Sequence, residues 1–258
     1  MRVMMKKVVF FTGAGISKES GIATFRDGGG RWTLFDFLKC ASREALESDP
    51  ERVLEFYNGR RREVNLAHPN EAHLRIAEFQ KEHGQVSLIT QNIDDLHERA
   101  ESGEVLHLHG QINQAKTMES GEVIEWFGDL SLDDLHHGEQ LRPNVVLFDE
   151  DVTEYELAEL VVFDADVLVV IGTSLSVYPA AGLVKAVGKH CEVIYLDPAE
   201  PAYTWHVPNY RHIKKSACEG IQEVIGILKG DQDAVAEGPR SPITMGEKPA
   251  ELDTVSAS

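Results

Sequence analysis

Short runs of consecutive apolar residues recur along the chain, and longer amphipathic segments separate them. Apolar runs of this length are typical of strands that are buried on both faces of a parallel sheet. The runs predicted to be such strands are residues 8–12, 86–90, 144–148, 167–172 and 193–197. The intervening segments place apolar residues at helical spacing and have Gly or Pro near their ends. This alternation predicts an α/β fold with a Rossmann-like, doubly wound parallel sheet.

Two segments depart from this alternation. Residues 33–75 are helical in pattern, whereas residues 112–142 are polar and irregular. We predict that both belong to a smaller inserted domain. The Rossmann-like domain is then discontinuous and consists of residues 1–32, 76–111 and 143–230.

The last segment of the chain, residues 231–258, has no apolar periodicity. It is rich in Pro, Ser, Thr, Gly and acidic residues, a composition that does not form a packed core. We expect a disordered acidic tail.

Composition and charge narrow the possible classes of protein. A chain of 258 residues with 42% hydrophobic content can bury a substantial core. The formal net charge of −18 argues against a protein that binds nucleic acid, because phosphate binding depends on clustered Lys and Arg. The three cysteines form no C-x-x-C pair, and no apolar run is long enough to span a membrane. We expect a protein of the reducing cytoplasm.

The first predicted strand ends in the turn Gly13-Ala14-Gly15. Glycines at this place let the backbone approach a pyrophosphate, whose charge is stabilised by the N-terminus of a following helix. An ordinary tight turn remains the alternative, because the third glycine comes late, at Gly21, and the pattern is not a full G-x-G-x-x-G.

A second polar motif follows the strand at residues 86–90. Gln91, Asn92 and Asp94 offer the donors and acceptors that ribose hydroxyls and a nicotinamide amide require, although Asn92 or Asp94 could equally cap a helix. His107 and His109 lie two residues apart, and on a strand they share a face. A lone histidine is more often structural, but a neutral imidazole is also the usual general base at pH 7.

Taken together, these motifs resemble those of the sirtuin (Sir2) family. The matching blocks, in the order of the family, are GAGISKESGIATFRD, TQNIDDLHERA, HLHG, RPNVVLFDE, GTSLSVYPAAGL and LDP. The resemblance implies a Rossmann domain with a small domain and NAD as the cofactor. It further implies an NAD-dependent protein lysine deacylase that produces nicotinamide and O-acyl-ADP-ribose.

The resemblance also implies roles for individual residues. His109, directly before Gly110, matches the catalytic base, with Asn92 and Asp94 also in the catalytic set, whereas His107 is left with a packing or hydrogen-bonding role. Residues implied in cofactor binding are Gly13, Ala14, Gly15, Phe25, Arg26, Gln91, Asn92, Ile93, Asp94, Gly172, Thr173, Ser174, Leu196, Asp197 and Ala217.

One helical segment indicates which acyl group the enzyme would remove. Tyr57 and Arg60 are three residues apart and share a helix face, and they match the Y-x-x-R element of class III sirtuins, which binds the carboxylate of succinyl- or malonyl-lysine. Ala41 matches a small residue that leaves room for the longer acyl chain. The alternative is a solvated basic helix face, because Arg61 and Arg62 follow directly.

The substrate groove is implied to include Val146 and Phe148. Beside them Asp149 stands where many sirtuins have glycine, and the sequence does not indicate the effect of this difference. The implied partners are the acylated lysine side chains of proteins, with no nucleic acid and no membrane.

The segment in which most sirtuins hold a structural zinc contains no cysteine here. His136, His137, Asp133 and Asp134 could bind a metal, but adjacent histidines are expected to point apart, and we predict no metal site. The small domain must then be held by apolar packing. Its candidate core residues are Ile124, Trp126, Phe127, Leu130, Leu132 and Leu135.

Alternative functions use the same cofactor pocket. A mono-ADP-ribosyltransferase or an NAD glycohydrolase would leave the acyl-lysine channel unused, which Tyr57, Arg60 and Ala41 count against. A non-catalytic NAD-sensing module is less favoured because His109, Asn92 and Asp94 are all present. A dehydrogenase is disfavoured because the full G-x-G-x-x-G is missing.

Overall fold

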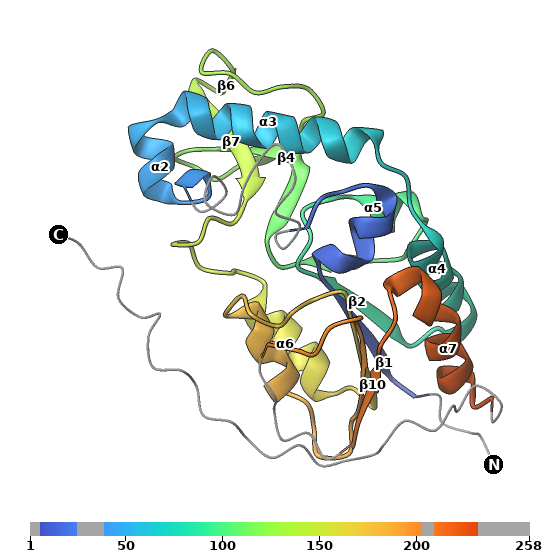
Figure 1. The fold of residues 1–258 in the computed structure, drawn as a ribbon. Helices are drawn as coiled ribbons and strands as arrows, with labels where there is room; N and C mark the ends of the chain where they lie inside the picture. The colour runs from blue at the N-terminus through green and yellow to red at the C-terminus, as the bar shows by residue number, and fades with distance from the viewer. Residues whose placement is uncertain (1–5, 25–38, 203–208, 232–258) are drawn as a thin grey trace.

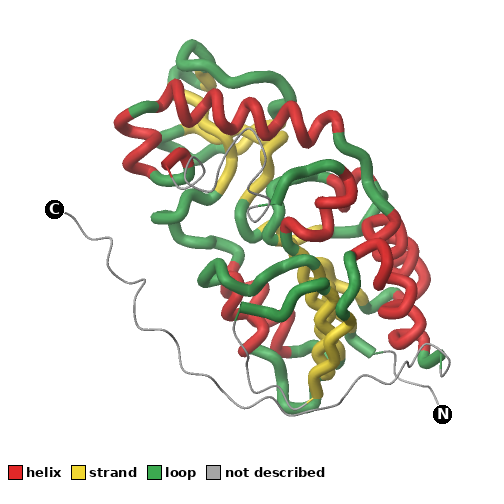
Figure 2. Tube along the Cα trace, in the orientation of Figure 1, coloured by secondary structure: helices red, strands yellow, loops and turns green. Residues whose placement is uncertain are grey.

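The computed structural model describes residues 6–24, 39–202 and 209–231, and it contains two separate sheets (Figures 1 and 2). The larger sheet has six parallel strands in the order β10-β9-β8-β1-β2-β3. Its strands are β1 (Val8–Thr12), β2 (Val86–Thr90), β3 (Val105–His107), β8 (Val167–Ile171), β9 (Glu192–Leu196) and β10 (Asn209–Ile213). The Rossmann-like fold class is therefore confirmed.

The strand order reverses direction between β1 and β8. From β1 the chain adds β2 and β3 on one side, and it later adds β8, β9 and β10 on the other. Val8 is in register with both Val86 and Val167, so Thr12, Thr90 and Ile171 end their strands at the same level. In such sheets a ligand binds outside the carboxyl ends of the strands at this switch point.

Helices cover both faces of the large sheet (Figure 1). On one face α4 (Glu71–His83) and α7 (Ala217–Lys229) pack over a core that includes Phe10. On the other face α6 (Tyr155–Phe163) and the 3₁₀ helix η2 (Ala180–Lys185) pack over a core that includes Phe11. Successive strand residues point to opposite faces, so a run that is apolar throughout fills both cores.

The smaller sheet is antiparallel and has four strands in the order β5-β4-β7-β6. Its strands are β4 (Gly110–Thr117), β5 (Val123–Glu125), β6 (Leu135–His136) and β7 (Glu139–Val145). Helix α3 (Pro50–Leu66) lies across it (Figure 1). The shorter α2 (Arg43–Ser48) ends at Asp49, whose side chain caps α3 ahead of Pro50. Proline is favoured at this first helical position, and it divides one predicted helical segment into two helices.

The prediction of a parallel strand at residues 144–148 was wrong. The strand in this region, β7, ends at Val145 and pairs antiparallel with β4, where Gly110 lies opposite Val145. Val145 and Leu147 are buried against Tyr57 of α3, so their apolar character comes from packing under a helix. The remaining parallel strands, β3 and β10, are short or mixed in polarity and give no clear apolar run.

Residues 112–142, whose sequence pattern is polar and irregular, form most of the small sheet. Its core is smaller than predicted. Leu130 is 2% exposed, with Ile124 and Trp126 packed against it, whereas Phe127 and Leu135 are 61% and 57% exposed. Leu132 is likewise exposed. A sheet covered by a helix on one face buries only alternate residues, and the sequence did not reveal which ones.

Three named parts of the sequence prediction fall outside the described residues: Phe25, Arg26 and almost all of the 231–258 segment. Among the described helices, none has the length and apolar character needed to cross a membrane.

A carboxylate joins two turns of the small sheet. Glu139, at the start of β7, accepts hydrogen bonds through Oε2 from Glu119 N (3.1 Å), Ser120 N (2.8 Å) and Ser120 Oγ (3.2 Å). The Thr117 hydroxyl lies 2.7 Å from that of Ser120 and accepts from Glu122 N. The hydrogen bond from Ser120 N is the main cause that lowers the pKa of Glu139 below its usual 4.5.

We expect Glu139→Gln to lower the Tm at pH 7, because the charge that strengthens these hydrogen bonds is lost. Because the pKa of Glu139 is lower in the folded state, its ionised form stabilises the fold above pH 4.5. This contribution is lost as the pH falls through the folded-state pKa. The Tm difference between variant and wild type should therefore shrink progressively as the pH falls below 4.5. Thermal unfolding from pH 3 to 8 measures this, with Glu119→Gln on the same turn as the control. A Tm difference that is the same at every pH would contradict it.

Candidate active site

Two glycine turns meet at the switch point of the large sheet. Gly13-Ala14-Gly15 follows β1, and Gly172-Thr173-Ser174 follows β8. Gly15 N donates to Gly172 O at 2.7 Å, and a Cβ on Gly15 would lie only 2.7 Å from the Cα of Gly172. Gly172 itself has a φ of 62°, which favours glycine. The two turns are thus in backbone contact, and a side chain at either glycine is excluded.

The TQNID motif following β2 joins the same place through hydrogen bonds. Gln91 Nε2 donates to Thr173 Oγ1 at 3.0 Å, which links the β2 and β8 turns. Asn92 Nδ2 donates to Ser17 Oγ at 3.1 Å, and Ser17 Oγ donates to Asp94 Oδ2 at 2.9 Å. Ser17 lies in the 3₁₀ helix η1 (Ala14–Ser20), so three motifs distant in sequence form one polar cluster.

Asn92 and Asp94 are 7% and 5% exposed. Burial is the main influence on the pKa of Asp94 and raises it, while hydrogen bonds from Ser17 and from Leu96 N oppose the shift. Such a buried carboxylate and amide can accept from ribose hydroxyls and donate to an amide carbonyl.

His109 lies between β3 and β4, next to this cluster. Its Nδ1 is 2.8 Å from Gln91 O, and because a carbonyl only accepts, Nδ1 carries the proton. This tautomer leaves the lone pair on Nε2 as the basic position. Burial lowers the pKa of His109 below 6.5, with the Gln91 hydrogen bond opposing it, so the ring is neutral at pH 7. A neutral imidazole with a fixed tautomer is suited to act as a general base.

The predicted substrate residues lie along the segment beside His109. Val146 N donates to His109 O at 3.0 Å, and Phe148 N donates to Ala41 O at 2.8 Å. Ala41 is buried, whereas the Phe148 side chain is 52% exposed. The Asp149 carboxylate accepts from Arg43 N at 2.8 and 3.1 Å, so it caps α2. The aspartate thus ties the groove segment to the small domain.

Tyr57 and Arg60 lie on α3 over the small sheet. Tyr57 is 3% exposed and shares an apolar cluster with Ile22, while Ile93 packs against the same cluster. Burial raises the pKa of Tyr57 well above 10, so its hydroxyl is protonated. Arg60 donates to Glu63 Oε2 at 2.8 Å and to Ala23 O at 3.3 Å. The pair therefore lies between the TQNID motif and the segment that follows η1.

The residues predicted to lie near the adenosine are mostly buried in the core or bonded within their own turns. Leu196, the last residue of β9, is buried in the same core cluster as Ala217 and Ile221 of α7. Asp197 Oδ1 accepts from Ala199 N at 2.8 Å and Ser174 Oγ lies 2.6 Å from Ser176 Oγ, so both side chains order their own turns.

The expectation that adjacent histidines point apart was wrong. His136 Nε2 lies 3.2 Å from Glu122 Oε1, and His137 Nε2 lies 4.0 Å from Glu122 Oε2. The convergence arises because His137 has a φ of 53° and Gly138 a φ of 85°, which turns both rings toward Glu122. All three residues are at least partly exposed.

A four-cysteine zinc site does not fit this chain. Cys40 is buried under α3, Cys191 is buried before β9, and Cys218 is on α7. None is in the small sheet. The prediction that no metal is bound stays a prediction.

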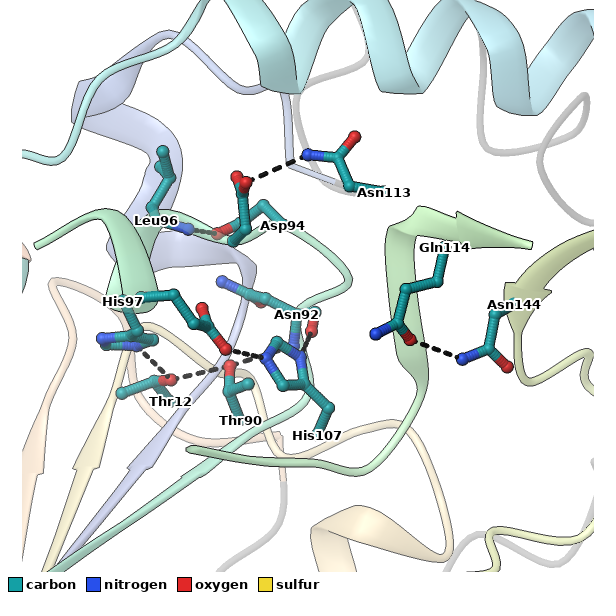
Figure 3. A network of polar contacts seen from close by, with 12 residues as sticks. Thr12, Thr90, Asn92, Asp94, Leu96, His97, His107, Asn113, Gln114 and Asn144 are labelled. Atoms are coloured by element: carbon teal, nitrogen blue, oxygen red, sulfur yellow. Dashed lines mark hydrogen bonds and ion pairs between the residues drawn. The ribbon is translucent and has the colours of Figure 1, made fainter. Parts of the chain in front are cut away.

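The sequence did not identify the polar residues beneath the motifs. Thr12 and Thr90, the last residues of β1 and β2, bond through their hydroxyls at 2.9 Å, and His97 Nε2 lies 3.0 Å from Thr12 Oγ1 (Figure 3). Their only signal was a threonine at the end of each strand, where a run that is otherwise apolar turns polar.

Comparison with known proteins decides the family. Residues 13–179 match the model of the Sir2 family, which is more than half of the chain. The chain belongs to the Sir2 family. The match contains both glycine turns, the TQNID motif and His109.

Relatives of this Sir2 chain agree with that assignment. A Helicobacter pylori protein named NAD-dependent protein deacylase is 44% identical over 224 residues, covering 86% of this chain and 96% of the relative. A Sir2 homologue solved as an NAD complex has a TM-score of 0.77 and 36% identity, covering 88% and 91% of the two chains. A Sir2 bound to acetylated peptide has a TM-score of 0.71 and 26% identity, covering 87% and 94%. The predicted class, an NAD-dependent protein deacylase, is confirmed at the level of the family.

We expect Gly15→Ala to damage the site directly. The added Cβ would meet the backbone of Gly172, which cannot move without disturbing two hydrogen-bonded strands, at a cost of about 1–3 kcal/mol in the free energy of unfolding. NAD affinity should fall as well. Chemical denaturation and calorimetric NAD titration measure both effects, with Gly128→Ala as the control, since nothing lies within 4 Å of a Cβ there. Equal stability and affinity in the two variants would contradict the expected clash.

Proposed function

We propose that this Sir2-family enzyme removes succinyl and malonyl groups, as well as acetyl groups, from protein lysine side chains, with His109 as the base. The observation that carries the proposal is the position of His109. The ring of His109 hydrogen-bonds to Gln91 O of the polar cluster, and the backbone carbonyl of His109 accepts from Val146 N of the groove segment. His109 therefore lies between the cofactor motifs and the groove segment, which supports its role as the base.

The polar cluster fits NAD by its donor set and its place in the fold. The glycine turns at the switch point offer backbone to a pyrophosphate, and Gln91, Asn92 and Asp94 offer both donors and acceptors. NAD supplies an activated bond between ribose and nicotinamide. The buried Asn92 and Asp94 would orient the ribose of bound NAD, and the apolar cluster against which Ile93 packs would help exclude water.

With NAD bound, Nε2 of His109 would be the atom that accepts a proton from a ribose hydroxyl. The hydrogen bond from Nδ1 to Gln91 O keeps the ring in this tautomer, and burial keeps it neutral. The bond to Gln91 also stabilises the imidazolium that forms, because a carbonyl oxygen remains an acceptor for a charged ring.

Tyr57 and Arg60 support the preference for acidic acyl groups. Tyr57 can donate its hydroxyl proton to a carboxylate, because its pKa stays high. Arg60 already holds one carboxylate, that of Glu63, at 2.8 Å. An acyl carboxylate would take the place of Glu63 on the guanidinium, and the side chain of Glu63, 40% exposed, has solvent into which to move.

Release of nicotinamide distinguishes the alternative functions. An NAD glycohydrolase or an ADP-ribosyltransferase would release nicotinamide without an acylated peptide, whereas the proposed enzyme requires one. Following product masses with acetyl-, succinyl- and malonyl-lysine peptides, and with none, separates these activities.

We expect His109→Tyr to lower the deacylation rate by roughly 10²- to 10⁴-fold, the usual contribution of a general base. NAD affinity should change little, because the ring of His109 hydrogen-bonds to the backbone carbonyl of Gln91 and not to the side chains of Asn92 and Asp94. Steady-state kinetics and calorimetric NAD titration test this. The exposed His190→Tyr is the matched control. Turnover retained in His109→Tyr would remove His109 as the base.

We expect Arg60→Met to lower kcat/KM for succinyl-lysine peptide by roughly 10- to 100-fold, as for the loss of a charged hydrogen bond. Acetyl-lysine turnover should fall much less. Arg62→Met is the matched control, because Arg62 pairs with exposed Asp129 away from Tyr57. If Arg60→Met weakens both substrates equally, the acidic-acyl preference is wrong.

A further inference from the structure

Two histidines contact successive carbonyl groups of the TQNID motif. His109 Nδ1 lies 2.8 Å from Gln91 O. His107 Nδ1 lies 2.9 Å from Asn92 O, as Figure 3 shows. Both rings are on the β3–β4 segment, and a carbonyl can only accept, so both Nδ1 atoms carry a proton. The histidines differ at the other ring nitrogen.

His107 Nε2 lies 2.7 Å from Glu98 Oε1, on α5 (Leu96–Arg99). An ionised carboxylate also accepts only, so both nitrogens of His107 must donate and the ring is an imidazolium. The His107 side chain is 5% exposed, whereas that of Glu98 is 38% exposed. A cation at this depth is stable only with a partner charge, and Glu98 provides it.

Charges around His107 agree with this state. Burial lowers the pKa of His107, but the hydrogen bond and charge of Glu98, the hydrogen bond to Asn92 O and the charge of Asp94 together raise it above 6.5. His97, its neighbour on α5, is itself held neutral, because burial lowers its pKa far below 6.5. The groups that face His107 are therefore two carboxylates and one neutral ring.

Three hydrogen bonds hold Asn92 in place. Its backbone N donates to Thr90 Oγ1 at 3.1 Å, its side chain donates to Ser17 Oγ, and its carbonyl accepts from His107. Ser17 Oγ in turn donates a hydrogen bond to Asp94 Oδ2. Loss of the His107 bond would remove one of the three bonds that hold Asn92, so the peptide between Asn92 and Ile93, and with it the side chains of Asn92 and Asp94, would be less tightly oriented.

We propose that His107, paired with Glu98 as an imidazolium, is a positioning residue that fixes the Asn92 carbonyl and so orients Asn92 and Asp94 for deacylation. The proposal rests on the proposed function in one respect, namely that Asn92 and Asp94 line the reacting site. It assigns unlike tasks to two neighbouring histidines, since His109 is a neutral base and His107 a fixed cation.

Two amide variants separate the two bonds of His107. In His107→Asn the amide nitrogen replaces Nδ1 and can reach Asn92 O, while in His107→Gln it replaces Nε2 and can reach only Glu98. We expect His107→Gln and His107→Ala to lower kcat by roughly 10- to 100-fold, the cost of a misplaced site. KM for the peptide should change little, because the groove residues Val146 and Phe148 are untouched. His107→Asn should recover most of the lost kcat.

The charge of His107 is measured separately, by NMR of the imidazole nitrogens in the full chain with ¹⁵N-labelled histidine. We expect both ring nitrogens of His107 to carry protons at pH 7. In Glu98→Gln the pKa of His107 should fall by about one unit or more, because the partner charge is gone. Thermal unfolding of each variant confirms that it is folded.

The results separate this inference from the proposed function. A neutral His107 at pH 7 would overturn the imidazolium, and equal kcat for the Asn and Gln variants would overturn the positioning role. Full turnover by His109→Tyr would overturn the proposed base instead, and it would leave the NMR result for His107 standing.

Discussion

The backbone contact between Gly15 and Gly172 is the constraint on which the site depends. The hydrogen bond of 2.7 Å from Gly15 N to Gly172 O joins the turns of β1 and β8 at the switch point of the sheet. Parallel register brings the end of β2 to the same level, where the hydroxyls of Thr12 and Thr90 meet at 2.9 Å. Residues that are far apart in the sequence therefore share one edge because three strands end together.

The TQNID motif links this edge to the rest of the molecule. Gln91 reaches the β8 turn through Thr173, and Asn92 reaches η1 through Ser17. Between them Ile93 packs against the cluster of the small domain that contains Tyr57, and Ile93 O accepts from Ile112 N of β4. One loop thus contacts both sheets, so the geometry of the cofactor motifs and that of the groove depend on the same few peptide groups.

The sequence predicted the large sheet better than the small one, for a physical reason. A strand buried on both faces, such as β8, is apolar throughout and easily recognised, whereas residues 112–142 expose one face and resemble a loop. Motif resemblance placed His109 and Asn92 at the site, but not the state of their neighbours. The cationic form of His107 depends on Glu98, nine residues away, and the convergence of His136 and His137 depends on a positive φ. Neither contact follows from spacing.

The conditions that weaken a sheet joined by the Glu139 carboxylate differ from those that weaken a sheet held by metal-bound thiolates. This carboxylate joins the turn at Glu119 and Ser120 to the β6–β7 hairpin through hydrogen bonds alone, and residues 110–145 contain no cysteine. The Glu139 cross-link itself contains no thiol, so a thiol oxidant has no group to attack in it. Acidification, which protonates the carboxylate, is the condition that weakens it.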